Sequence, residues 1–150
     1  MKAKIILNTY FTISVFCHNL VEPFDLNDTT NPDNRIFGID HIEELNNNIL
    51  EFYSKRNKCQ SFNFFSNLRS YIFELYLYIQ LIEDGDEKIT HKAFMMKTTG
   101  GPEFFKIATE RQNFPREMGW DKSETELYTN LIIDVEQAWN SLSRMLDVLC

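Results

Sequence analysis

The residues with the clearest capacity for chemistry lie within eight positions of one another. Asp84, Asp86, Glu87 and His91 bring three carboxylates and one imidazole together, and Glu87 and His91 have i,i+4 spacing. This spacing places two side chains on one face of a helix, where they can ligate a divalent metal ion. Acids at the N-terminal end of a helix are also favoured by the helix dipole. The sequence favours the second interpretation, and no metal or other cofactor is expected.

No catalytic motif with an established spacing is present. The sequence contains no GxSxG turn, no phosphate-binding GxxxxGK[ST] or GxGxxG loop, and no paired spacing among His18, His41 and His91. The amide groups of 98–102 precede an expected helix and can bind an anion there, although a turn between two helices needs the same glycines. An enzyme of this size usually shows at least one acid–base or metal pair. We therefore expect a protein without enzymatic activity.

The net charge of the chain indicates which kinds of partner it can bind. The 150-residue chain carries a formal net charge of −7 at pH 7, and its pI is about 4.9. The frequent Asn and Ile residues resemble the usage of an AT-rich bacterial or phage genome. An acidic surface repels nucleic acid and anionic lipid and suits a basic protein. The expected partner is another protein, and neither nucleic acid nor a membrane is expected to bind.

The cysteines and the N-terminal residues bear on location. Cys17, Cys59 and Cys150 are odd in number and widely spaced, so they fit neither a disulfide framework nor a zinc site. Lys2 and Lys4 precede a semi-apolar stretch that outlines a signal peptide, but no small-residue cleavage site follows. No run of about 18 apolar residues indicates a membrane helix. A reducing, cytoplasmic location is expected.

Composition predicts one all-α domain, a bundle of about five helices over residues 1–150. Hydrophobic residues make up 43% of the chain, which has only 5 Gly and 4 Pro. The apolar residues are enough for a sizeable core, and the low Gly and Pro content predicts long helices joined by few turns. Residues 5–22 leave two alternatives open, because their alternating apolar positions fit a β-strand and their 4-3-4-3 spacing fits a helix.

Two long helices are indicated by apolar spacing. Apolar residues over 61–83 step by three and four, with an aromatic stripe beside them, so this helix is expected to be central and buried on several sides. A second stripe over 123–149 follows Ser123 and Glu126, which have the spacing of a capping box. The residues of the two apolar stripes are Phe65, Leu68, Ile72, Leu75, Ile79 and Ile82, and Leu127, Leu131, Val135, Ala138, Leu142, Met145 and Leu149.

Shorter elements connect these helices. A helix near 40–54 is expected to begin at Asp40, with Glu43 completing a capping box. Two short helices are expected after the acidic turn at 83–87, the second with Pro102 in its first position. Residues 23–38 and 113–120 are expected to be loops, because they are rich in Asn, Asp, Pro or Gly.

A small, acidic chain without catalytic motifs fits an inhibitor of the immunity or antitoxin type. Such a protein neutralises a basic toxin or effector by covering its active site, and charge complementarity speeds the capture. The candidate contact residues are Asp84, Asp86, Glu87, Phe114, Trp120 and Asp121. Phe114 and Trp120 stand among charged residues and have two interpretations, either as exposed contact aromatics or as side chains packed on the core.

Two other functions remain open on the sequence. One is a metal-binding or enzymatic helical bundle that uses the cluster from Asp84 to His91. The other is a structural homo-oligomer that associates through an exposed apolar stripe on the last helix.

Overall fold

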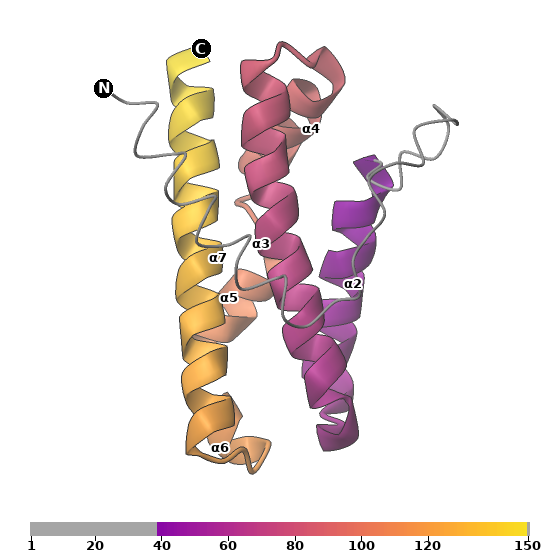
Figure 1. Ribbon diagram of the computed structural model, residues 1–150, viewed down its shortest axis with the longest axis vertical. Helices are drawn as coiled ribbons and strands as arrows, with labels where there is room; N and C mark the ends of the chain where they lie inside the picture. The colour runs from indigo at the N-terminus through magenta and orange to yellow at the C-terminus, as the bar shows by residue number, and fades with distance from the viewer. Residues whose placement is uncertain (1–38, 150) are drawn as a thin grey trace, which may run out of the picture. The chain divides into compact units, whose positions relative to one another are not determined.

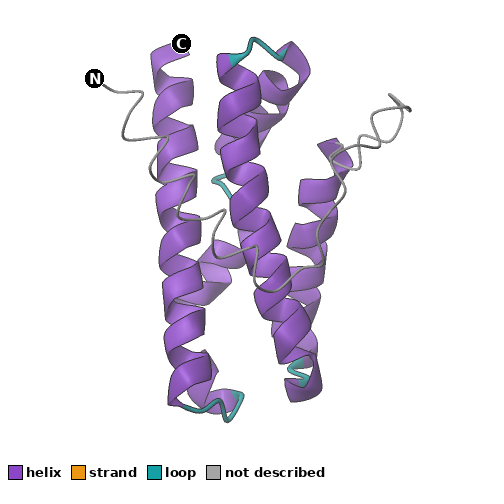
Figure 2. Ribbon diagram, in the orientation of Figure 1, coloured by secondary structure: helices purple, strands orange, loops and turns teal. Residues whose placement is uncertain are grey.

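The computed structural model describes residues 39–149, and all regular structure in this range is helical (Figures 1 and 2). The all-α prediction is confirmed. The alternatives for 5–22, the loop predicted at 23–38 and the cysteines at 17 and 150 lie outside the described residues. The elements in chain order are α2 (Ile39–Lys55), the 3-10 helix η1 (Lys58–Gln60), α3 (Ser61–Glu83), α4 (Glu87–Thr98), α5 (Glu103–Glu110), α6 (Phe114–Glu117) and α7 (Lys122–Leu149).

The central helix is α3, whose bounds match the prediction for 61–83. It packs against α2 on one side and α7 on the other, and it also contacts α4 (Figure 1). Of the predicted stripe, Phe65, Leu68, Ile72, Leu75 and Ile82 are buried and Ile79 is partly buried, whereas Phe62 and Phe73 on the same helix are exposed. A helix that contacts three neighbours needs an apolar surface over most of its circumference.

The last helix begins close to the predicted position but is capped by a different pair of residues. The Glu124 backbone N–H donates to Asp121 Oδ1 at 2.8 Å, and the Asp121 N–H donates to Glu124 Oε2 at 2.9 Å. This is a capping box, so the prediction of Ser123 and Glu126 as the box is wrong. Trp120 is buried directly before Asp121, so the chain enters the helix two residues earlier than that prediction required.

The apolar stripe of α7 packs inward. Tyr128, Leu131, Val135, Ala138, Leu142 and Leu146 are buried, whereas Leu127 and Met145 are partly buried and Leu149 is exposed. The stripe rests mainly on α3. It therefore no longer supports association of the protein through an exposed face of this helix.

The first described helix is longer than predicted. Because α2 is already helical at Ile39, Asp40 lies inside the helix, and its prediction as the N-cap is wrong. The predicted apolar face is confirmed, since Ile42, Leu45, Ile49 and Phe52 are all buried. Tyr53 joins them, and its hydroxyl lies 2.8 Å from the Tyr128 hydroxyl of α7.

The loop predicted between α5 and α7 contains a helical turn, α6. Pro115 occupies its first turn, where a missing N–H costs no helical hydrogen bond. Gly119 follows with a φ of +62°, a conformation that glycine adopts without strain. Glycine and proline at 113–120 therefore delimit a short helix, which is why a purely irregular loop was the wrong prediction.

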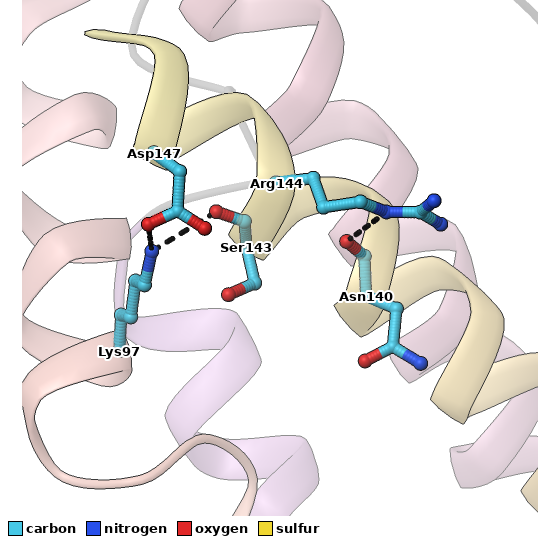
Figure 3. A network of polar contacts seen from close by, with 5 residues as sticks. All are labelled: Lys97, Asn140, Ser143, Arg144 and Asp147. Atoms are coloured by element: carbon cyan, nitrogen blue, oxygen red, sulfur yellow. Dashed lines mark hydrogen bonds and ion pairs between the residues drawn. The ribbon is translucent and has the colours of Figure 1, made fainter. Parts of the chain in front are cut away.

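The link from α4 to α5 is held against α7. Pro102 is the N-cap of α5 and not its first helical residue. Lys97, near the end of α4, donates to the Ser143 carbonyl of α7 at 3.1 Å and forms an ion pair with Asp147 (Figure 3). In the same figure the Arg144 Nε–H donates to the Asn140 carbonyl within α7. The two contacts of Lys97 attach the end of α4 to α7.

Among the described residues, no helix is both long and apolar enough to cross a membrane.

Candidate functional site

The acidic turn, Glu83–Glu87, joins α3 to α4 at one end of the bundle (Figure 1). Gly85 has a φ of +87°, which allows the chain to reverse within the turn. Asp86 is the N-cap of α4, and its Oδ1 accepts from the Ile89 N–H at 3.0 Å. Glu83, Asp84 and Glu87 are exposed. Three carboxylates therefore face solvent while the fourth stabilises a helix.

The acidic turn is not neutralised by the part of the chain that the structure describes. No Lys, Arg or His side chain among residues 39–149 forms an ion pair with Glu83, Asp84, Asp86 or Glu87. The acids elsewhere on this surface are often paired, as Glu51 is with Lys55 and Glu117 with Arg56. The turn is thus a concentrated negative charge that no cationic side chain of residues 39–149 pairs with.

The same geometry argues against the metal site. Within residues 39–149, no group of three or more His, Cys, Asp or Glu side chains is arranged to hold a metal ion. The Asp86 carboxylate is engaged by the α4 backbone. His91 lines a groove, described below, that Asp84 and Glu87 do not line. The described structure therefore gives no support to the interpretation of Asp84–His91 as a metal centre.

Phe114 and Trp120 belong to the core. Their side chains are 0% and 8% exposed, and their rings are perpendicular with centroids 5.6 Å apart. The Trp120 indole N–H donates to the buried Ser61 hydroxyl at 2.8 Å. Asp121 is exposed and caps α7. Of the two interpretations, core packing holds for both rings, because they close the end of the bundle between α3 and α7.

The six predicted contact residues do not form one surface. Trp120 contacts Ser61 at the start of α3, and the acidic turn follows the end of the same helix. The 23 residues of α3, at about 1.5 Å per residue, separate the two ends by about 33 Å. Only Asp84, Asp86 and Glu87 remain together as a candidate contact surface.

A groove on another face was not predicted by the sequence. Its volume is about 780 Å³, and its walls come from α2, with Ile42, Glu43 and Asn46, and from one face of α4. Tyr71 of α3 and Pro102 before α5 also line it. An ion pair between Lys92 of α4 and Glu43 of α2 crosses the groove. This volume lies in the range typical of sites for small ligands.

The α4 wall of the groove changes character along its length. Lys88, His91 and Lys92 line the part near the start of the helix, and Met95, Met96 and Thr99 line the part near its end. The spacing of these six residues follows one helical face. The spacing of these α4 residues is visible in the sequence. Without the wall formed by α2, however, it could not be distinguished from that of an ordinary solvent-exposed helix face.

A buried carboxylate lies between α2 and α3. Glu74 is 1% exposed, and its Oε1 lies 3.8 Å from His41 Nε2. Burial raises the pKa of Glu74 above its usual range, and the nearby His41 lowers it by less. Within the sequence, Glu74 was visible only as an acid in an otherwise apolar helix.

Comparisons of this chain with protein families, with curated proteins and with solved structures found no match.

Proposed function

We propose that the protein is an inhibitor of the immunity or antitoxin type, which binds a basic toxin or effector protein and covers its active site without enzymatic chemistry of its own. The observation that carries this proposal is the acidic turn, whose four carboxylates have no cationic partner among residues 39–149. The net charge of −7 supports the same class of partner.

Electrostatic complementarity gives the acidic turn its role in binding. An exposed cluster of like charge attracts an oppositely charged protein and raises the association rate, while contacts formed afterwards set the residence time. A toxin that acts on nucleic acid has a basic active site for the same physical reason. The acidic turn would enter such a site in place of the phosphate backbone.

The proposal includes a cytoplasmic location. Cys59 supports it, because this thiol is exposed and forms no disulfide in the described structure.

Charge reversal tests the proposed surface. The full chain and the variant E83K/D84K are immobilised, proteins are captured from an extract of the source cells, and the captured partner is produced and mixed with each inhibitor. The two substitutions leave the Asp86 cap intact. We expect the double variant to bind at least about tenfold more weakly, mainly through a slower association rate at low salt. The full chain, unlike the variant, is expected to block the partner's activity.

The matched control is E110K/E136K, which changes the net charge equally at two exposed acids on α5 and α7. If this control weakens binding as much as E83K/D84K does, net charge and not the acidic turn is responsible. A captured partner that is acidic, or whose activity is unaffected by the full chain, would contradict the proposed function itself.

A further inference from the structure

The groove between α2, α4 and the start of α5 has an uneven charge. Lys88 lies in the first turn of α4, is exposed, and has no ion-pair partner among the described residues. Lys92 is one turn further along and is paired with Glu43. His91 lies between them on the same wall. On a chain of net charge −7, the two lysines give this end of the groove a positive charge that Glu43 only partly offsets.

The other end of the groove is apolar. Met95 and Met96 follow on α4, and Pro102 closes the groove before α5. Methionine side chains are flexible and polarizable, so they adapt to apolar ligands of different shapes. From Lys88 to Thr99 the α4 wall extends about 16 Å. Glu103, which begins α5 at the apolar end, would oppose a negative group there.

Asn46 supplies an independent observation. Asn46 is one of the residues that line this groove, and its Oδ1 is buried without a hydrogen-bond partner among the described residues. A buried polar atom without a partner is unfavourable. If the Asn46 amide turns toward the groove, a ligand carrying an amide N–H or a hydroxyl next to its apolar body would satisfy this oxygen.

We propose that this groove binds an amphipathic carboxylate, with its acid group near Lys88 and Lys92, its apolar body against Met95, Met96 and Pro102, and a hydrogen-bond donor facing Asn46. The cationic end and the apolar end of the α4 wall determine the orientation. Glu103 at the apolar end disfavours the reverse orientation, whereas the acid at the cationic end, Glu43, is paired with Lys92.

Three probes separate charge from apolar contact. N-octanoylglycine carries a carboxylate, an amide N–H and an apolar chain; decanoate lacks the amide, and decyltrimethylammonium reverses the charge. Titration of the full chain by calorimetry is expected to show one saturable site for N-octanoylglycine, weaker binding of decanoate, and at least about tenfold weaker binding of the cation. Equal affinity for the anionic and cationic probes, or no saturable binding of N-octanoylglycine, would overturn the proposal.

Variants assign the contacts. K88E is expected to weaken binding of both carboxylates about tenfold, whereas K106E, an equal change of charge at an exposed position of α5 outside the groove, is expected to have little effect. N46L is expected to abolish the preference for N-octanoylglycine over decanoate. If K88E and K106E have the same effect, the acid group does not lie in this groove. These outcomes are independent of the acidic turn, which none of the variants changes.

Discussion

Glu74 has a carboxyl group, which favours water, in a buried position. Its carboxylate is buried between α2 and α3, and Oε1 has no hydrogen-bond partner among the described residues. His41 lies close enough to favour the ionised form, but desolvation is the larger effect and the pKa is raised. Ionisation of Glu74 therefore opposes folding.

The sign of the pH dependence follows from this shift. At a pH below the ordinary glutamate pKa, Glu74 is protonated in both the folded and the unfolded chain and causes no loss of stability. As the pH rises, the unfolded chain ionises first, so the contribution of Glu74 to the free energy of unfolding falls until the raised pKa is passed. The loss then persists at neutral pH.

We expect Glu74→Gln to increase the free energy of unfolding at pH 7 by on the order of 1 kcal/mol, because the amide cannot ionise. Denaturant unfolding measured from pH 4 to pH 8 is also expected to show a smaller fall in stability for the variant than for the wild type. Glu44→Gln is the control, since Glu44 is exposed on α2 and also faces His41, at 3.9 Å. A variant at position 74 that is less stable than the wild type at pH 7 would show that the ionised carboxylate stabilises the fold.

The individual helices depend on a few residues at their ends. The capping box at the start of α7 satisfies two backbone N–H groups, those of Asp121 and Glu124. Because α7 has 28 residues and packs on the central helix, fraying at its start also exposes the aromatic residues beside it.

Asp121→Ala is expected to lower the free energy of unfolding by about 1 kcal/mol, the usual cost of losing an N-cap. Ser123→Ala is the matched control and is expected to change it by only a few tenths of a kcal/mol, because Ser123 is exposed and lies inside the helix. Thermal or denaturant unfolding followed by circular dichroism measures both. The reverse ranking of the two variants would favour the capping box first predicted from the sequence.

The turn between α4 and α5 relies on two adjacent glycines with different surroundings. Gly100 and Gly101 have φ values of +94° and +90°. A Cβ atom at Gly101 would lie 2.8 Å from the indole of Trp139, whereas a Cβ atom at Gly100 would meet nothing within 4 Å. A side chain would therefore strain the backbone at both positions, but it would meet a close contact only at Gly101.

Gly100→Ala is expected to lower the free energy of unfolding by about 1 kcal/mol through backbone strain alone. Gly101→Ala is expected to lower it by about 1–3 kcal/mol more, because α5 or the Trp139 ring must move. Unfolding measured by Trp fluorescence compares the two variants directly. Equal losses would mean that the indole moves aside without cost.

At the scale of the whole molecule, the described helices share one core centred on α3. Leu75 is fully buried on this helix, which contacts α2, α4 and α7. Truncating the Leu75 side chain would therefore leave a cavity in the core that these helices share.

Leu75→Ala is expected to lower the free energy of unfolding by about 2–5 kcal/mol. Ile133→Ala, at a 43% exposed position of α7, is the control and is expected to lose less than about 1 kcal/mol. Circular dichroism and Trp fluorescence should report one common transition for the wild type, because the core is shared. Two separate transitions would contradict the prediction of a single domain over residues 1–150.

Charge is also a property of the whole molecule, and its distribution is uneven. The acids of the acidic turn, which have no ion-pair partner among residues 39–149, and the lysines of the groove lie at the two ends of a short segment, from Glu83 to Lys92. The net charge of −7 conceals this contrast, because a sum over residues carries no information about position.

The sequence by itself determined the long helices of the described chain and the buried stripe of α3, but not the short helix α6. Phe65, Leu68, Ile72 and Leu75 predict both, because helix formation and the burial of an apolar stripe depend on spacing along one segment. The acidic turn was equally visible, since its residues are consecutive. The spacing of residues in the sequence is sufficient to predict such features wherever the residues involved are close in the chain.

Only the tertiary structure decided which residues share a surface. Phe114 and Trp120 lie among charged neighbours in the sequence and yet pack in the core, because α3 brings Ser61 and other partners to them. The groove, likewise, joins Asn46 of α2 to Lys88 of α4. Such contacts connect residues more than 40 positions apart, and their geometry depends on how whole helices pack, which the spacing within each helix does not specify.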